Sequence, residues 1–307
     1  MSTLVLFDGN ALVHRAFHAI PPLTTSKGEV VNAVYGFALM LIKVIGEIKP
    51  DYLAVAFDRA APTFRHVEFA AYKAQRPRAP EGLFDQFDRV RELVRAFGIP
   101  IFEVDGFEAD DVLGTLARQA DERGLETVIV TGDADALQLV GPRVRVLTPQ
   151  RTFADTKLYD EAAVRERYGL EPAQLVDYKA LKGDASDNIP GVPGVGEKTA
   201  VRLLQEFGSL EGIYARLESV PEKTRALLAQ HEELARQSRH LATIVRDVPI
   251  TLDLDACRAS GYDRSRVVEL FRELEFRSLL PRLPASLGKT EQRPVGEAAP
   301  AGNGQPQ

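Results

Sequence analysis

Three short apolar runs, each ending in an aspartate, constrain the fold of this chain more than any other feature of its sequence. They occupy residues 3–8, 52–58 and 127–133. Continuous apolar runs of this length are typical of buried strands, and helical patterns lie between them, which predicts an α/β fold with a mostly parallel sheet. Because ligands bind outside the carboxyl ends of such strands, we expect the three terminal aspartates to lie at one edge of the sheet.

Weaker patterns complete the expected sheet and its helices. Two further strands are expected at residues 100–104 and 144–147. Residues 30–49 have helical periodicity, which stops before Pro50. Helices of this kind would flank the sheet.

Composition and patterning favour a cytoplasmic protein with no membrane segment. The most apolar stretch is interrupted by Lys43 and Glu47 and is too short to cross a bilayer. The N-terminus lacks the basic and apolar regions of a signal peptide. The single cysteine, Cys257, excludes an internal disulfide framework and suits a reducing compartment.

A cluster of acids follows the third expected strand, at Glu108, Asp110 and Asp111. Alone, such a cluster could simply complement the positive end of the helix that begins there. Like charges about 4 Å apart repel by roughly 4 kcal/mol at an effective dielectric constant of about 20, so acids gathered from several strand ends require cations. Asp8, Asp58, Asp133 and Asp135 recur at the other strand ends. The pattern therefore predicts a divalent-metal site.

The expected ligands identify the kind of metal. A site built from carboxylates suits Mg²⁺ or Mn²⁺. His14 and His18 are spaced like a zinc pair on a helix, but no third histidine or cysteine ligand is evident near them in the sequence. Zinc is therefore not expected.

Residues 59–92 read as a basic, aromatic insertion with poor periodicity, directly after a site acid. Pro77, Pro80 and Gly82 interrupt any helix there. A solvated surface loop is one interpretation, but long loops without a core pattern are often functional. Basic residues mixed with aromatics suit phosphate contacts and base stacking, for which the candidates are Arg65, Tyr72, Lys73 and Arg76.

After Asp160 the chain becomes helical and contains a glycine-rich turn. Gly191, Gly194 and Gly196 precede a helix that carries Lys198 and Thr199 near its start. Backbone N–H groups at such a helix start can bind phosphate, although the glycine spacing is not that of a P-loop. A helical hairpin that needs glycine for its turn is the alternative.

These patterns divide the chain into three parts. Residues 1–180 form the expected α/β core with the insertion as an arch, and residues 181–283 form a helical region. Residues 284–307 contain few apolar residues and are expected to be a disordered tail or linker. The net charge of −6 does not exclude a DNA partner, because nine of the acids belong to the candidate site.

Six motifs together resemble the 5′-nuclease domain at the N-terminus of bacterial DNA polymerase I and, more distantly, the flap endonucleases. They lie at residues 6–10, 56–58, 72–76, 106–111, 131–135 and 182–196. The resemblance covers about residues 3–283 and keeps every acidic position. It implies a PIN-like fold with a helix–three-turn–helix element.

The resemblance also implies a role for each candidate residue. Two Mg²⁺ or Mn²⁺ ions would be bound, the first by Asp8, Asp58, Glu108 and Asp110, the second by Asp110, Asp133, Asp135 and Asp187. Asp111 and Asp184 would lie in the outer shell, and Lys73 and Arg76, beside Tyr72 in the arch, would grip the scissile phosphate. Residues 191–200 would hold duplex DNA, with a bound K⁺.

The implied activity is cleavage of DNA at 5′ flaps, nicks or 5′ ends, as in primer removal and repair. We expect a monomer, which could be linked to a polymerase module in a longer chain. Two alternatives remain open. One is a PIN-type ribonuclease, although such domains are usually shorter and lack the glycine-rich element. The other is a DNA-binding protein that does not cleave.

Overall fold

A six-stranded sheet forms the centre of the computed structural model, which describes residues 1–76, 80, 82–150 and 155–288. The strand order is β3-β2-β1-β4-β5-β6, and the first five strands are parallel. The bounds are β1 Thr3–Asp8, β2 Tyr52–Ala56, β3 Ile101–Phe102, β4 Glu126–Val130, β5 Val144–Pro149 and β6 Thr156–Tyr159. The expected parallel sheet is thus confirmed, whereas β6, which pairs antiparallel with β5, was not predicted.

Alternate residues of the central strands pack into two separate cores. In β1, Val5 and Phe7 face one core while Leu4 and Leu6 face the other. This alternation follows from the strand geometry, in which successive side chains point to opposite faces. Because both faces are covered by helices, the strands are apolar throughout, as expected for a buried parallel sheet.

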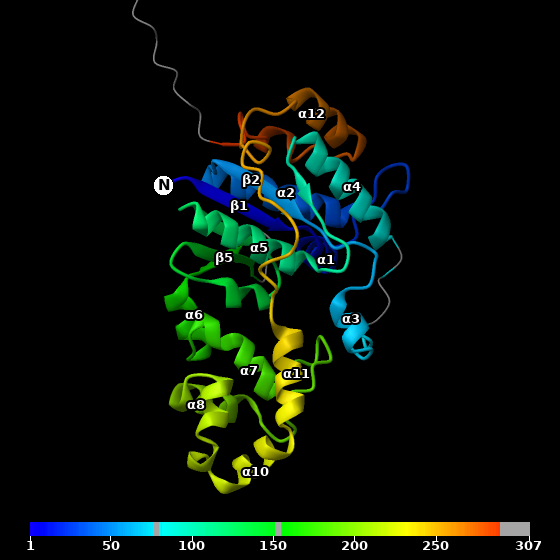
Figure 1. Ribbon diagram of the computed structural model, residues 1–307. Helices are drawn as coiled ribbons and strands as arrows, with labels where there is room; N and C mark the ends of the chain where they lie inside the picture. Colours follow the sequence, from blue (N-terminus) through cyan, green and yellow to red (C-terminus); the bar gives the residue numbers. More distant parts are fainter. Residues whose placement is uncertain (77–79, 81, 151–154, 289–307) are drawn as a thin grey trace, which may run out of the picture.

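Helices cover both faces of the sheet and extend beyond it (Figure 1). On one side lie α1 Gly9–Ala19, α2 Asn32–Ile48, α4 Leu83–Ala96 and α12 Arg264–Glu273. Helix α5 Ala109–Glu122 covers the other face of the sheet, and the short helix α3 Phe64–Glu68 contacts α5 through Arg65 and Asp111. The remaining helices are α6 Glu161–Tyr168, α7 Leu175–Lys182, α8 Glu197–Phe207, α9 Leu210–Ala215, α10 Glu222–Gln230 and α11 Glu232–Ala242. Short 3-10 helices are η1 Asp135–Leu139, η2 Pro172–Gln174, η3 Leu217–Ser219 and η4 Leu280–Arg282.

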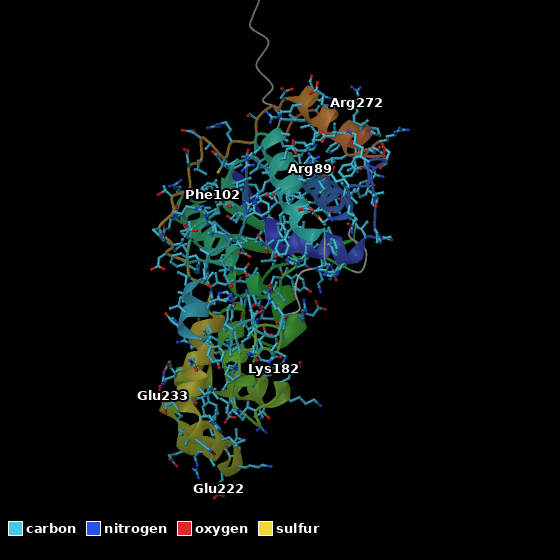
Figure 2. All side chains as sticks on the ribbon, turned by 90° about the vertical axis from the view of Figure 1, so that its right-hand side faces the viewer. Arg89, Phe102, Lys182, Glu222, Glu233 and Arg272 are labelled. Carbon is cyan, nitrogen blue, oxygen red and sulfur yellow. The ribbon has the colours of Figure 1, made fainter. Side chains whose placement is uncertain are left out.

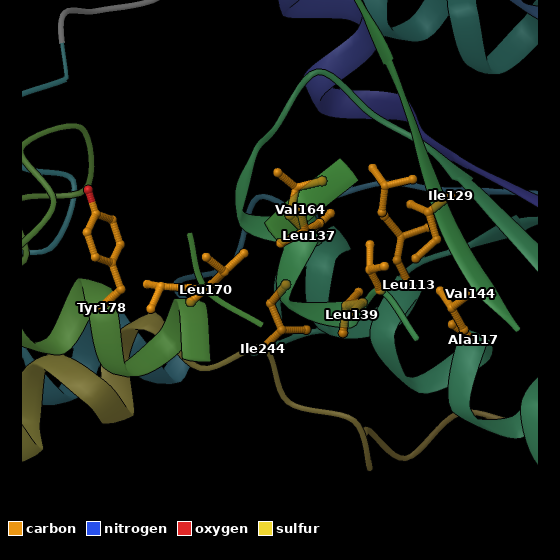
Figure 3. Close-up of a cluster of buried hydrophobic side chains, with 14 of the residues drawn as sticks. Leu113, Ala117, Ile129, Leu137, Leu139, Val144, Val164, Leu170, Tyr178 and Ile244 are labelled. Atoms are coloured by element: carbon orange, nitrogen blue, oxygen red, sulfur yellow. The ribbon is translucent and has the colours of Figure 1, made fainter. Parts of the chain in front are cut away.

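The core under α5 continues from the sheet into the helical region (Figure 3). Leu113 and Ala117 of α5 pack with Ile129 of β4 on the sheet side. Ile244, from the segment after α11, and Tyr178 of α7 belong to the same cluster. The sheet and the helices beyond it therefore share one continuous apolar core.

After α11 the chain returns along α5 to the sheet. The side chain of Gln119 donates to the carbonyl of Ile250 (2.8 Å) and accepts from the N–H of Leu252 (2.8 Å). Arg123 donates to the carbonyl of Leu252 (2.8 Å). Helix α12 then packs beside α4, where Arg89 pairs with Glu273 at 2.8 Å, and Figure 2 places Arg89 and Arg272 at this end of the molecule. The C-terminal end of the expected helical region 181–283 therefore packs against the sheet.

Two further sequence-based expectations need correction. The second half of the insertion at 59–92 is the helix α4, whose residues Leu83 and Val90 are fully buried in the core. The expected tail begins too early, because Leu287 is only 3% exposed and packs in the same core. The rest of that tail, residues 289–307, lies outside the described residues. No helix in the described parts of the chain has the length and apolar character needed to cross a membrane.

Candidate active site

Asp8 and Asp58 lie at the carboxyl ends of neighbouring strands, where the sequence placed them. Asp8 ends β1 and caps α1 by accepting a hydrogen bond from the N–H of Ala11 (2.9 Å). It also accepts from the hydroxyl of Thr131, just after β4 (2.6 Å). Asp58, two residues beyond β2, accepts from the N–H of Ala109 (2.6 Å). These bonds draw the ends of three elements together.

Helix α5 begins at this edge and brings the second group of acids. Its first residue is Ala109, so the hydrogen bond to Asp58 satisfies an N–H group that has no partner within the helix. Glu108 caps the helix, and Asp110 lies in its first turn. The positive helix end favours these carboxylates, but it offsets only part of their mutual repulsion.

Asp133 and Asp135 follow β4 in a tight turn. The N–H of Asp133 donates to the hydroxyl of Thr131 (2.9 Å), and the N–H of Asp135 donates to the carboxylate of Asp133 (2.9 Å). Thr131 therefore links this turn to Asp8, because its hydroxyl donates to that carboxylate. Asp135 begins η1, which packs beside α7 of the helical region.

Asp184 and Asp187 lie in the turns after α7 and approach the strand-end acids from the helical region. Asp184 accepts hydrogen bonds from the N–H (2.8 Å) and hydroxyl (2.6 Å) of Ser186. Asp187 accepts from the hydroxyl of Tyr72 at 3.1 Å and pairs with Arg76 at 2.6 Å. The helical region thus supplies two of the candidate carboxylates.

The charges of these acids are poorly balanced. Burial, together with the charges of Asp58 and Asp133, raises the pKa of Asp8 to about 7. Burial and the charge of Asp133 raise the pKa of Asp135 to about 7 as well. The pKa of Asp110 is raised by burial and by Asp133 and Asp8. These shifts show that the carboxylates are close neighbours that lack sufficient positive charge.

Asp184 is the exception among these carboxylates. Burial alone would raise its pKa, but the ammonium of Lys179, 2.5 Å from its Oδ2, holds that pKa at about 2. Lys179 also pairs with Asp135. The sequence patterns gave no sign of this lysine, because one cation within a helix is usually solvated.

A cavity of about 440 Å³ opens beside the acids. The strand-end acids and the start of α5 form one wall, and α1 and the arch residues form the other. Its lining comprises Asp8, Asn10, Ala11, His14, His18, Asp58, Lys73, Arg76, Pro80, Glu108, Ala109, Asp110 and Asp133. The sequence reasoning missed Asn10, whose side chain accepts a hydrogen bond from the N–H of Asp58 (2.9 Å). Its position in an Asp-Gly-Asn turn was the available signal.

The donor set fits hard divalent cations. It consists of carboxylate oxygens, which Mg²⁺ and Mn²⁺ prefer, and burial and the neighbouring carboxylates raise the pKa values of Asp8, Asp110 and Asp135. Among the described residues, no three or more potential ligands converge closely enough to form a ready-made metal cage. Binding would therefore require side chains to turn toward the ion. Each acid's assignment to a particular metal stays a prediction.

Lys73 and Arg76 point at these acids from the arch. Lys73 pairs with Glu108 at 2.8 Å, and the hydroxyl of Tyr72 donates to the same carboxylate at 3.1 Å. The stretch carrying them is a series of turns, in which Lys73 has a left-handed backbone (φ +53°), rather than a regular helix. Both cations thus line the cavity, where a phosphate would replace the carboxylates as their partner.

Arg65 does not fit its expected role in DNA binding. Its side chain is 3% exposed and donates to both oxygens of Asp111, at 2.7 and 2.8 Å. It also donates to the carbonyls of Leu241 and Thr243. Asp111 is completely buried and also accepts from the N–H groups of Glu108 and Val245. The carboxylate is therefore satisfied within the fold, which suits an outer-shell residue and not a direct metal ligand.

The glycine-rich element connects α7 to α8 at the surface. Gly191 has φ +63°, and a Cβ there would lie 2.2 Å from the backbone nitrogen of Gly183, so this turn requires glycine. Gly194 also has a positive φ, and Gly196 caps α8. Lys198 is exposed and Thr199 partly exposed in the first turn of α8. The structure therefore supports the hairpin interpretation and leaves the helix start accessible to an anion.

This arrangement defines a class of protein. A parallel sheet whose strand ends gather carboxylates, with a lysine and an arginine paired to these acids beside a cavity, is typical of a phosphodiesterase. Two family models match the chain: "5′-3′ exonuclease, N-terminal resolvase-like domain" over residues 3–169 and "5′-3′ exonuclease, C-terminal SAM fold" over residues 170–265. The chain belongs to the 5′-3′ exonuclease family.

Curated relatives support this membership over almost the whole chain. DNA polymerase I of Chloroflexus aurantiacus is 51% identical over 290 residues, which cover 92% of this chain and 31% of that protein. DNA polymerase I of Bacillus caldotenax is 46% identical over 297 residues, covering 96% of this chain and 34% of that protein. The chain spans about a third of the length of these relatives.

Solved structures show the same fold at much lower identity. A structure of T5 5′-exonuclease with zinc ions bound has a TM-score of 0.62 at 21% identity and covers 89% of this chain and 98% of its own. The T5 flap endonuclease in complex with DNA and metal ions has a TM-score of 0.62 at 22% identity, covering 92% and 96%. The catalytic core of Rad2 with a DNA substrate has a TM-score of 0.60 at 17% identity, covering 92% of both chains.

Proposed function

We propose that this nuclease hydrolyses DNA phosphodiester bonds at 5′ flaps, nicks and 5′ ends with two divalent metal ions. The observation that carries the proposal is the gathering of under-compensated carboxylates beside Lys73 and Arg76 in one cavity. Asp8, Asp58, Glu108 and Asp110 would hold one ion, and Asp110, Asp133, Asp135 and Asp187 the other. When bound, such ions activate water and stabilise the leaving oxygen.

The arch residues would position the scissile phosphate. Lys73 and Arg76 are seated on Glu108 and Asp187. Once a phosphate enters the cavity, the two side chains can pair with it in place of these carboxylates. They would then stabilise the negative charge that develops on the phosphate during cleavage. The single hydroxyl proton of Tyr72 is shared between these two carboxylates, each 3.1 Å away, and would hold them apart from the phosphate.

Binding of the duplex would occur away from the cavity. The exposed start of α8, with Gly196, Lys198 and Thr199, offers backbone N–H groups and one ammonium to a DNA backbone. A K⁺ ion held by this element would add positive charge next to the DNA backbone. Acting as a monomer, the chain could also work next to a polymerase module, since the curated relatives are about three times longer.

Two alternatives make different predictions. A PIN-type ribonuclease would prefer RNA, and a non-cleaving protein would bind flaps without hydrolysis. Family membership and the presence of all nine predicted acids favour DNA cleavage over both. A matched pair of labelled DNA and RNA flaps would distinguish the first alternative.

One assay tests the proposal directly. Labelled flap DNA incubated with the protein and Mg²⁺ should be cut, EDTA should abolish the cutting, and Mg²⁺ or Mn²⁺ should restore it. Asp133→Ala and Asp110→Ala should each abolish cleavage while leaving DNA binding measurable, because the duplex is held elsewhere. Asp85→Ala, an exposed acid of α4, is the control. Full activity in EDTA would refute the two-metal proposal.

A further inference from the structure

Lys179 is the cation that the proposed chemistry leaves without a role. Its ammonium pairs with Asp135 and lies 2.5 Å from Oδ2 of Asp184, and its side chain is only 17% exposed. These two acids are 49 residues apart in the sequence and come from η1 and from the turn after α7. One lysine thus neutralises Asp135, a proposed ligand of the second metal, and Asp184, an outer-shell acid beside it.

The support of Lys179 differs from that of the other two cations at the acids. Lys73 and Arg76 come from turns of the arch, so a rearranged arch can carry them away. Lys179 belongs to α7, where its neighbours Tyr178 and Ala180 are buried in the core. Its backbone is therefore fixed, and only its side chain can leave the acids.

The structure provides space for that movement. A second cavity, of about 240 Å³, shares Asp133 with the lining of the first. Lys179, Asp135 and Asp184 all line it. The ammonium can swing into this cavity without displacing the backbone of α7, which would free both carboxylates for another cation.

A tethered ammonium and a divalent ion compete for the same oxygens. The ammonium supplies one positive charge to the carboxylates. When a phosphate joins these carboxylates, the total negative charge is large enough to bind a divalent ion in addition to the ammonium. Before substrate binds, the lysine satisfies the acids and makes divalent binding less favourable. A substrate phosphate brings negative charge that restores the attraction for the ion.

We propose that Lys179 is a built-in counter-cation of the second metal position, which keeps divalent affinity low there until DNA enters. The inference rests on the proposed two-metal function. Lys179 is a positioning residue, because it would act through Asp135 and Asp184 and not on the substrate. The second ion would then bind mainly in the productive complex.

Lys179→Met removes the charge while keeping the length of the side chain, and Lys179→Gln is a second variant in case the first folds poorly. Lys182→Met is the matched control. It makes the same charge change three residues further along α7. Lys182 lines the same cavity, but its ammonium lies 5.1 Å from the ring of Tyr178 and, among the described residues, pairs with no carboxylate. Circular dichroism and melting curves in EDTA would establish that each variant folds.

Calorimetric titration with Mn²⁺, with and without uncleaved flap DNA, gives a readout independent of catalysis. In the absence of DNA, Lys179→Met should tighten the weaker Mn²⁺ site by about tenfold, whereas Lys182→Met should change it little. The tightening that DNA produces should be smaller in Lys179→Met than in the parent. Unchanged or weaker Mn²⁺ binding by folded Lys179→Met or Lys179→Gln would overturn the inference alone. No Mn²⁺ binding by the parent, with or without DNA, would overturn the proposed function and the inference together.

Discussion

Arg65 and Asp111 form a buried ion pair with two parallel hydrogen bonds, which joins α3 to α5 directly behind Glu108. Arg65 Nη1 also lies 3.5 Å from Oε2 of Glu108. The pair therefore helps to position Glu108, a candidate metal ligand. It also fixes the start of the arch relative to α5.

We predict that Arg65→Ala and Asp111→Ala each lower the free energy of unfolding by about 3–5 kcal/mol, because each leaves a buried charge without its partner. The double variant Arg65→Ala/Asp111→Ala should lose less than the sum of the single losses, since both single changes break one interaction. Urea unfolding would measure these values. Additive losses would show that the two residues act independently.

Lys73→Ala should slow the chemical step by about 10²–10³ at saturating flap DNA, because one preorganised donor to a developing anion is lost. Affinity should fall far less, since the duplex is held elsewhere. Arg76→Ala should behave alike, and the double variant should lose less than the product of the two. Single-turnover rates with separately measured affinities would test this, with Gln75→Ala as control. A normal saturated rate for Lys73→Ala would restrict that residue to binding.

Lys198→Ala should weaken binding to duplex DNA and reduce the slope of log affinity against log salt by roughly one unit, as expected for one lost phosphate contact. The saturated cleavage rate should stay nearly constant. Lys27→Ala removes an exposed lysine from the loop beside Glu275, and serves as a control. Equal effects of the two substitutions would indicate a general loss of charge instead of a specific contact.

The metal-free protein should lose stability as pH rises from about 4 to about 7. Burial raises the pKa of Asp8 and Asp135 to about 7, so the folded state binds protons that the unfolded state has already released in this range. Melting temperatures in EDTA should therefore be lower at pH 8 than at pH 5.5. Mg²⁺ should reduce this difference, and Asp8→Asn should reduce it more than Asp85→Asn. A melting temperature in EDTA that rises over this range would contradict the prediction.

Two deletions at the end of the chain should have different effects on stability. Removing residues 289–307 should leave the melting temperature unchanged, because this stretch contains few apolar residues. Removing residues 285–307, by contrast, should lower the free energy of unfolding by about 1.5–3 kcal/mol, because the buried side chain of Leu287 is lost. Calorimetry of both truncated proteins would test this. A large loss from the shorter deletion would show that residues 289–307 pack against the fold.

The parallel sheet and most of the acid cluster were predictable, because their signals are local. An apolar run that ends in aspartate identifies a buried strand and its functional end within seven residues, as at 52–58. The edge strand β6 gives no such signal, since Tyr159 is its only fully buried residue. Helix α4 was missed because Arg89 and Arg91 masked its apolar face.

Long-range pairing accounts for the remaining errors. Nothing around Arg65 indicates that its partner is Asp111, 46 residues away, so an isolated arginine in a basic stretch looked like a DNA contact. The contact of Lys179 with Asp135 spans 44 residues and was equally invisible. The return of α12 to the sheet depends on packing against α4, which no local pattern encodes.

Helix α5 carries Glu108 at its start and holds the returning chain along its length through Gln119 and Arg123. The helical region is therefore anchored twice, by the chain that enters it after β6 and by the chain that leaves it along α5. A module attached by one linker could swivel, whereas the hydrogen bonds of the returning chain to α5 restrict such motion here. We expect the proposed cleavage site to lie a fixed number of nucleotides from the duplex bound at α8, because the two attachments limit how far the helical region can move.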